Sequence, residues 1–281
     1  MKTEDVLKEN ARAVQVANNR NSLLCDGTIS EIARTFLRDA TLIDPTHIYE
    51  SVMGENLCTP EFAKYCVFVC DETRKMSAAD FLPESVVVAS DPQTARIAYQ
   101  QNYHSDRAYS LFFRTVQYEV QAIYRPTTVS VCEEVYYGRC THCILPIYSS
   151  TDGIFPTIAK LMDKYDLIIN AACDVVMPDG DSVMRFALLS HELSLPSSNT
   201  CYVQFNAVLP QSISLATFLL SCETVGASVA EMITLPLAYT MDKVSYTIRL
   251  HISHKNLTAL LMFLHSVLDN YSLEGIFQII Q

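Results

Sequence analysis

The segment from Cys143 to Ile158 constrains the fold more than any other part of the sequence. Residues 143–147 form an apolar run, residues 148–153 form a polar turn, and a helix-like pattern begins at residues 155–158. In an open α/β sheet, ligands bind where the ends of strands meet the starts of helices. We therefore expect a binding site at or near the turn of residues 148–153.

Strand-like and helix-like patterns alternate between residues 85 and 195. Strands separated by helices of about 10–15 residues are typical of βαβ units, so we expect a largely parallel sheet. A turn-rich break covers residues 177–181, and the best linker covers residues 195–199. The patterns predict strands at 85–89, 96–99, 119–124, 143–147, 166–172 and 185–189, and helices at 105–113, 129–137 and 154–164.

The last 80 residues predict a second kind of domain. Strand patterns cover residues 201–208, 228–237, 244–252 and 272–280, and helix patterns cover residues 214–224 and 256–268. The resulting βαββαβ order is that of ferredoxin-like domains, which cover one sheet face with two helices. The other face is left to pair with a second copy.

The first 84 residues predict a helical region. Helix starts are indicated by the Thr28–Glu31 capping pattern, by Asp44-Pro45 and by Thr59-Pro60. The chain therefore combines α/β with α+β architecture. The expected parts are a helical N-terminal region (1–84), an α/β domain (85–195) and a ferredoxin-like domain (200–281).

Composition and charge exclude several classes of function. The 281 residues are 49% hydrophobic and 18% charged, as in globular proteins. A net charge of −11 repels phosphate backbones and anionic membranes, so no nucleic-acid or membrane partner is expected. The chain has seven glycines and neither GxGxxG nor GxxxxGK[ST], so no cofactor is expected. No apolar run reaches about 20 residues and the start is polar, so we expect a cytoplasmic protein.

The ten cysteines indicate neither a disulfide framework nor a metal site. Most of them sit in apolar strings, where a thiol behaves as a small hydrophobic group. Cys140 and Cys143 have the CxxC spacing, but a structural zinc site usually needs two such pairs and the chain has one. We expect no metal.

Five segments follow one another in the order known from one enzyme family. They are residues 97–100 (Ile-Ala-Tyr-Gln), 128–135, 144–153, 165–169 and 184–186 (Met-Arg-Phe). In this order, and in the βαββαβ segment after them, residues 95–281 resemble prephenate dehydratases with a C-terminal ACT domain. The resemblance implies aromatic amino-acid metabolism, a periplasmic-binding-like α/β fold and a regulatory domain that binds phenylalanine.

The chain departs from the family at its motifs. Met184 stands where the family has the Thr of Thr-Arg-Phe, which is implicated in dehydration. Of the Glu-Asn-Ser turn only Ser150 is kept, since Tyr148 and Ser149 replace the other two residues. Moreover, 36 residues separate Tyr148 from Arg185, where the family inserts a whole second lobe. Either the lobe is lost, or residues 1–90 replace it from elsewhere in the chain, and we expect a truncated lobe. The glycines that the family has after its first strand are replaced by Gln101 and His104.

The resemblance assigns candidate roles around this turn. Dehydration needs an acid for the leaving hydroxyl and cations for two carboxylates. The candidate catalytic residues are Arg185, Ser150 and Tyr148, and the candidate ligand-binding residues nearby are Ser149, Thr151 and Arg107. The alternative is that Arg185 pairs with an acidic neighbour such as Asp174 while Tyr148 packs the turn.

The ACT-like segment also departs from its family. Ser212 and Ser214 lie in the segment that replaces the usual Gly-Ala-Leu turn, and Glu231 and Thr234 lie in the one that replaces Glu-Ser-Arg-Pro. These four residues are the candidate ligand contacts of this domain. Without the Gly, the backbone has less freedom to approach a ligand.

The first hypothesis is a divergent prephenate dehydratase-like protein of phenylalanine metabolism with little or no dehydratase activity. It would bind a small carboxylate or an aromatic amino acid, as a ligand-binding or regulatory protein, and form a homodimer or homotetramer through the ACT-like domain. An active dehydratase with a rebuilt site is the alternative, and a purely structural dimer is a third. Residues 59–75 loosely resemble the last helix of a chorismate mutase, so a vestigial mutase region belongs to the alternative.

Overall fold

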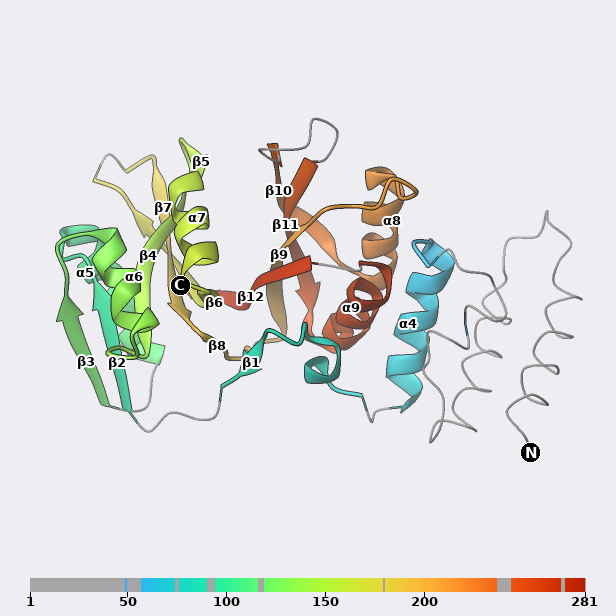
Figure 1. Ribbon diagram of the computed structural model, residues 1–281, viewed down its shortest axis with the longest axis horizontal. Coiled ribbons are helices and arrows are strands. Elements are labelled where there is room, and N and C mark those ends of the chain that lie inside the picture. The colour runs from blue at the N-terminus through green and yellow to red at the C-terminus, as the bar shows by residue number, and fades with distance from the viewer. Residues whose placement is uncertain are drawn as a thin grey trace, which may run out of the picture. The chain divides into compact units, whose positions relative to one another are not determined.

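The computed structural model describes residue 49 and residues 57–73, 76–89, 94–115, 119–178, 180–236, 244–268 and 271–280. The chain forms two compact units (Figure 1). One, here called the α/β unit, contains residues 84–206 and 272–281. The other, here called the helical unit, contains residues 207–271 and the described residues before 84. The helix starts predicted at Thr28 and Pro45 lie outside the described residues.

A mixed sheet is the framework of the α/β unit. Its strand order is β9-β12-β6-β7-β4-β2-β3, with β5 paired to β4. A separate parallel pair joins β1 to β8. The strands are β1 (Val87–Val88), β2 (Thr94–Tyr99), β3 (Glu119–Tyr124), β4 (His142–Ser149), β5 (Gly153–Ile154), β6 (Ile168–Val176), β7 (Val183–Ser190), β8 (Glu192–Leu193), β9 (Thr200–Ala207) and β12 (Tyr271–Ile280).

The prediction of a largely parallel sheet is wrong at the centre of this unit. β2 runs parallel to β3 and β4, and β12 runs parallel to β6. β7, however, is antiparallel to both of its neighbours, β4 and β6. Residues 177–182 alone connect β6 to β7, and a connection this short joins antiparallel neighbours, whereas parallel ones need a crossover of about a dozen residues or more. The turn-rich break therefore closes a hairpin.

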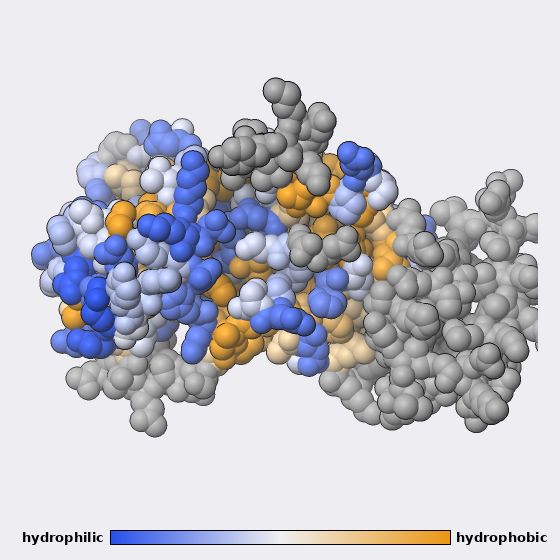
Figure 2. Space-filling model, in the orientation of Figure 1, coloured by the Kyte–Doolittle hydropathy of each residue, from blue (hydrophilic) through white to orange (hydrophobic). Residues whose placement is uncertain are grey.

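Helices cover both faces of this sheet. α5 (Tyr103–Thr115) packs against β4, β6 and β7, and α6 (Thr128–Tyr136) and α7 (Pro156–Lys164) pack against β4 from the other side. Because side chains alternate along a strand, each strand feeds both cores. Ile144 and Phe186 belong to the core under α5, whereas Leu145 and Ala187 belong to the core under α6 and α7. The surface that Figure 2 shows for this unit is mainly hydrophilic.

Helix starts in this unit follow local sequence rules. The Thr127 hydroxyl accepts a hydrogen bond from the backbone N–H of Ser130 (3.1 Å), which caps α6. Pro156 is the first residue of α7, where its missing N–H costs nothing. The predicted helices at 105–113, 129–137 and 154–164 are therefore confirmed within a few residues.

The helical unit packs α4 (Pro60–Thr73) against α8 (Leu215–Val225) and α9 (His254–Val267). The ring of Phe263 lies 6.2 Å from that of Phe62 and 6.1 Å from that of Phe218, so one aromatic cluster joins the three helices. A short helix, η1 (Ala78–Phe81), packs against α9. The antiparallel strands β10 (Ser228–Pro236) and β11 (Val244–Ser253) complete the unit.

The predicted βαββαβ order is present along the chain as β9-α8-β10-β11-α9-β12. Its two outer strands, β9 and β12, lie next to each other in the strand order and belong almost entirely to the α/β unit. Its two helices and its central hairpin belong to the helical unit.

Candidate functional site

A pocket of about 210 Å³ opens beyond the carboxyl end of β2, where α5 begins. We call it the strand-end pocket. One wall is apolar and comes from β4 and β7, and the opposite wall is polar and comes from the segment between β2 and α5 and from the start of α6. The lining residues are Gln100, Asn102, His104, Ser105, Thr128, Ile144, Leu145, Pro146, Met184 and Phe186.

The polar wall is the N-terminus of α5. The Asn102 side-chain oxygen accepts hydrogen bonds from the backbone N–H groups of His104 (3.1 Å) and Ser105 (2.9 Å). Its side-chain nitrogen donates to the carbonyl of Gln100 (3.2 Å). Asn102 is therefore the N-cap that fixes this turn. The N-terminus of a helix carries partial positive charge, which favours an anion beside it.

One side-chain atom at this terminus, His104 Nδ1, is buried without a hydrogen-bond partner in the described part of the chain. The next residue, Ser105, is 4% exposed. A buried polar group left unsatisfied costs about 1–3 kcal/mol. His104 is therefore positioned to gain from a polar ligand.

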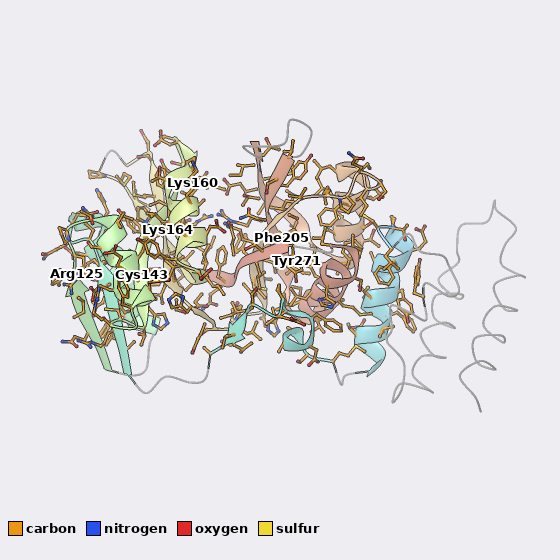
Figure 3. All side chains as sticks on the ribbon, in the orientation of Figure 1. Arg125, Cys143, Lys160, Lys164, Phe205 and Tyr271 are labelled. Carbon is orange, nitrogen blue, oxygen red and sulfur yellow. The ribbon has the colours of Figure 1, made fainter. Side chains whose placement is uncertain are left out.

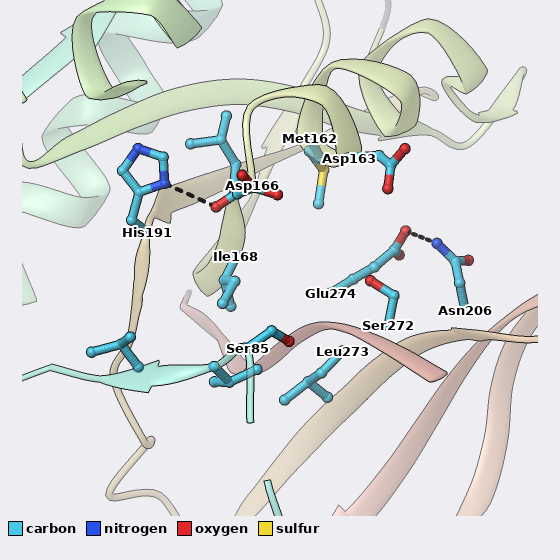
Figure 4. A pocket seen from close by; sticks show the side chains of 13 residues that line it. Ser85, Met162, Asp163, Asp166, Ile168, His191, Asn206, Ser272, Leu273 and Glu274 are labelled. Atoms are coloured by element: carbon cyan, nitrogen blue, oxygen red, sulfur yellow. Dashed lines mark hydrogen bonds between the residues drawn. The ribbon is translucent and has the colours of Figure 1, made fainter. Parts of the chain in front are cut away.

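A larger pocket of about 400 Å³ lies elsewhere in the α/β unit (Figure 4). We call it the acidic pocket, because Asp163, Asp166 and Glu274 line it and no Lys or Arg is among its described lining residues. Glu274 is 8% exposed and accepts hydrogen bonds from the side-chain amides of Gln204 and Asn206 (2.5 Å each).

The loop between α7 and β6 shapes the acidic pocket. Asp166 has a φ of 48°, a left-handed conformation that is uncommon for a residue with a side chain. His191 donates from Nδ1 to the backbone carbonyl of Asp166 (3.0 Å), as Figure 4 shows. Three carboxylates repel an anionic ligand, so the strand-end pocket suits a carboxylate better than the acidic pocket does.

The predicted catalytic residues Tyr148 and Arg185 lie opposite each other on β4 and β7. Arg185 makes a bidentate ion pair with Asp174, from Nε to Oδ1 at 2.7 Å and from Nη2 to Oδ2 at 2.9 Å. Its guanidinium carbon also lies 5.4 Å from the centre of the Tyr148 ring. Met184, the residue before Arg185, lines the strand-end pocket, whereas Arg185 and Tyr148 do not. The pairing of Arg185 with Asp174 is the alternative that the sequence left open.

The polar turn after β4 is held by its own hydrogen bonds. The Ser150 hydroxyl accepts from the backbone N–H of Val183 (2.9 Å), and the Ser150 N–H donates to the Val183 carbonyl (2.9 Å). The hydroxyls of Ser149 and Thr151 lie 2.7 Å apart, and the Thr151 N–H donates to Ser149 Oγ (3.2 Å). The three residues are brought together, and these contacts tie the turn to β7.

Arg107 lies on the exposed side of α5. Its Nη1 donates to the hydroxyl of Tyr103 (3.3 Å). Together with Ser110 and Arg114 it lines an open groove of about 350 Å³. It is not among the residues that line the strand-end pocket.

The four candidates of the ACT-like segment lie in the helical unit. Ser212 is exposed in a turn, and Ser214 caps α8 by accepting from the backbone N–H of Thr217 (3.1 Å). Glu231 accepts from Nη1 of the buried Arg249 (2.6 Å), so its charge is balanced within the unit. Thr234 is exposed on β10.

Asn102, Ser105 and Thr128 were not identified from the sequence, and His104 was noted only as a replacement for a family glycine. One local signal was present, since Asn immediately before a helical pattern is a strong N-cap indicator. The cap alone predicts a helix start. The pocket arises only when β4 and β7 pack beside it, which local patterns do not reveal.

The nine described cysteines are free thiols. Burial raises the pKa of the Cys143 thiol, which is labelled in Figure 3, well above its ordinary value. Burial also raises the pKa of the Cys140 thiol. A redox-active or metal-binding cysteine needs the opposite, a thiolate favoured at neutral pH. Among the described residues, no group of three His, Cys, Asp or Glu side chains is arranged to hold a metal ion. None of the described helices combines the length and apolar composition of a membrane span.

An open α/β sheet with a pocket at its strand ends defines the class of fold, and comparison with solved structures narrows it. No family model and no curated protein matches the chain. Prephenate dehydratase from Streptococcus mutans is 16% identical over 66% of this chain and 100% of its own, with a TM-score of 0.52. GqqA, described as a novel type of quorum-quenching acylase, is 15% identical over 66% of this chain and 95% of its own, with a TM-score of 0.50. Prephenate dehydratase from Arthrobacter aurescens, in complex with L-Phe, is 11% identical over 66% of this chain and 90% of its own, with a TM-score of 0.49.

The fold is therefore similar to that of prephenate dehydratases, in line with the resemblance seen in the sequence. Identities this low show the fold alone. Function has to be argued from the residues of the site.

Proposed function

We propose that this chain is a prephenate dehydratase-like protein that binds a small carboxylate, such as an aromatic amino acid, and has little or no dehydratase activity. The observation that carries the proposal is the N-terminus of α5, where His104 Nδ1 is buried without a partner among the described residues and Ser105 stands at the wall of the same pocket. A bound carboxylate would accept hydrogen bonds from these groups and compensate the positive end of the helix.

The opposite wall suits the apolar part of such a ligand. Ile144, Met184 and Phe186 supply aliphatic, thioether and aromatic surface. The volume of about 210 Å³ equals that of roughly seven water molecules at about 30 Å³ each. A compact molecule with one carboxylate and one apolar group fits this combination, whereas a nucleotide or a polymer does not.

Dehydratase chemistry finds little support in the same pocket. Loss of water and CO2 from prephenate requires an acid at the leaving hydroxyl and cations for two carboxylates. Among the described lining residues there is no Lys or Arg, and Met184 stands where the family has Thr. Arg185 lies outside the pocket and is paired with Asp174.

The interval that holds a second lobe in the family is short here. Between Tyr148 and Arg185 the chain forms β5, α7, β6 and the turn of residues 177–182. β5 and β6 pair with strands of the sheet, and α7 packs on it. The elements of this interval therefore belong to the sheet and its helical cover, which supports the proposal that this part of the chain adds no separate lobe.

The βαββαβ order supports an ACT-like role for residues 200–281. We propose that this segment mediates a homodimer or homotetramer. Ser212, Ser214, Glu231 and Thr234 stay the candidate ligand contacts, with Glu231 the weakest of them because Arg249 already holds its carboxylate.

Calorimetric titration of the full chain with L-phenylalanine, L-tyrosine, L-tryptophan and phenylpyruvate tests the binding proposal. A ligand at 100 times its Kd should raise the free energy of unfolding by about 2.7 kcal/mol. Ser105→Ala should weaken binding, and the matched control Ser110→Ala, on the exposed side of the same helix, should not. Absence of binding by all four compounds, or binding that ignores Ser105→Ala, would refute the proposal.

A prephenate assay tests the second half of the proposal. Phenylpyruvate formation should not exceed that of a blank. Turnover by the wild type that disappears in Arg185→Ala would instead establish the alternative, an active dehydratase with a rebuilt site.

A further inference from the structure

We infer that carboxylate binding in the strand-end pocket is coupled to the uptake of a proton by His104, so that the imidazolium takes the place of an arginine. This inference rests on the proposed function, because it concerns the same pocket. It adds a charge switch that the family motif lacks, since a glycine is expected at this position.

The position of His104 makes the coupling possible. It is the second residue of α5, and its backbone N–H is held by the Asn102 side chain (3.1 Å). Its side chain lines the pocket, and its Nδ1 atom is buried without a partner among the described residues. Nδ1 therefore has unused hydrogen-bonding capacity, and a protonated Nδ1 donates a hydrogen bond.

His104 is also the sole ionisable side chain among the described residues that line the pocket. β4 contributes Ile144, Leu145 and Pro146, β7 contributes Met184 and Phe186, and α6 contributes Thr128. None of these carries a charge. The charge state of the pocket is thus set by one imidazole and one helix terminus.

Ionisable groups nearby on α5 are engaged with other partners. The ring of Tyr103 meets that of His104 edge to face at 5.3 Å, and its hydroxyl accepts from Arg107. Asp106 accepts a hydrogen bond from the hydroxyl of Tyr99 (3.0 Å).

Two ionisable groups of the sheet face α5, and both stay neutral at pH 7. Burial raises the pKa of the Tyr99 phenol, and burial raises the pKa of the Cys173 thiol to about 12. Neither supplies a charge that would compete with the ligand for His104.

Electrostatics then couples the proton to the ligand. A carboxylate beside the ring favours the imidazolium, because a charge-assisted hydrogen bond to an imidazolium is stronger than a neutral one. A ligand whose binding is coupled to proton uptake by the protein binds more tightly as the pH falls. We therefore expect carboxylates to bind most tightly on the acidic side of the range in which imidazoles titrate.

The test uses 3-phenylpropionate, which has a carboxylate and no amine, and its uncharged amide as the comparison ligand. Calorimetry at about pH 8, 7 and 6, in two buffers of different ionisation enthalpy, counts the protons taken up. The Kd of 3-phenylpropionate should fall as the pH is lowered, by at most about tenfold per pH unit for one linked proton. The amide should bind with no pH dependence.

His104→Gln should abolish proton uptake and make the Kd independent of pH. His191→Gln, which removes the histidine of the acidic pocket, should leave proton uptake unchanged. Proton uptake that survives His104→Gln, or a wild-type Kd that does not vary with pH, would overturn the inference while leaving the proposed function intact. No binding of either compound or of the four earlier ones would instead overturn the proposed function.

A measurement on the wild type covers the case in which His104→Gln does not fold. NMR titration of the His104 ring signals should show protonation at a higher pH with saturating 3-phenylpropionate than without it. An unchanged titration would contradict the coupling.

Discussion

The strand-end pocket and the acidic pocket belong to the same unit, yet they have opposite electrostatic character. The first lies at the N-terminus of α5 and has no acidic residue among its described lining residues. The second lies at the C-terminal end of α7, where Asp163 and Asp166 add to the negative end of the helix and Glu274 adds a buried carboxylate. The larger pocket is therefore the poorer site for an anion. Helix polarity and the sign of the lining charges, rather than volume, determine which of the two pockets can bind an anion.

The largest effect should come from giving the strand-end pocket the character of the acidic one. Ser105→Asp places a carboxylate at the third residue of α5, where the positive end of the helix offsets part of the cost of burying its charge. The variant should fold and should bind carboxylates more than about 100-fold more weakly, a loss of about 2.7 kcal/mol. Calorimetry with the ligand of the wild type measures this. Ser110→Asp is the control, and an unchanged Kd in Ser105→Asp would show that the ligand binds elsewhere.

A smaller effect, on stability alone, should follow from removing the buried charge of the acidic pocket. Glu274→Gln takes an acceptor away from the amides of Gln204 and Asn206, so the free energy of unfolding should fall by about 1–3 kcal/mol. Urea denaturation measures it. Asp163→Asn, at an exposed position, should change stability by less than about 0.5 kcal/mol. Loss of carboxylate binding in Glu274→Gln would contradict the independence of the two pockets.

Proton effects on the fold can be separated from proton effects on the pocket. Burial lowers the pKa of His142 from 6.5 to about 4. Between these values the unfolded chain binds a proton that the folded chain does not, so stability should fall as the pH drops from 6.5 to about 4. The expected loss is at most about 3 kcal/mol, since the pKa differs by about 2.5 units between the two states and one unit corresponds to about 1.4 kcal/mol. Denaturation of the ligand-free protein at several pH values measures it, and His142→Gln should flatten this part of the curve.

The smallest effect should come from the ion pair outside the strand-end pocket. Asp174→Asn removes the partner of Arg185, and a partly exposed pair contributes about 0–1 kcal/mol. Thermal denaturation should show a small loss, and calorimetry should show an unchanged Kd for carboxylates. A tenfold change of Kd would mean that Arg185 reaches the ligand after all.

Much of the fold could be predicted because local rules determine it. β3 has the predicted bounds of residues 119–124, and Pro156 and Ser214 mark helix starts through capping chemistry that is readable in the sequence. The direction of β7 was predicted wrongly. The alternating strand and helix patterns predict that β7 runs parallel to its neighbours, although the turn before it is too short for a crossover connection. Reading residues 177–182 as a hairpin loop would have corrected it.

The site was harder to predict, because its walls come from four separate stretches of chain. Residues 100–105, 128, 144–146 and 184–186 meet only when the strands are in register. Arg185, the main catalytic candidate from the motif, misses the pocket wall by one residue, because its neighbour Met184 lines the pocket and Arg185 does not. Successive side chains of a strand point to opposite faces, so only one of these two neighbours can face the pocket. The sequence does not say which one until it is known which face of the strand lines the pocket.

This alternation makes the chemistry of the pocket wall sensitive to a single deletion. Shifting β7 by one residue against β4 and β6 would turn the whole strand over. Loss of one residue from the loop of residues 177–182 would then exchange the thioether of Met184 for the guanidinium of Arg185 on the same backbone. A permanent cation would then stand in a pocket that now offers an anion a helix terminus and an imidazole.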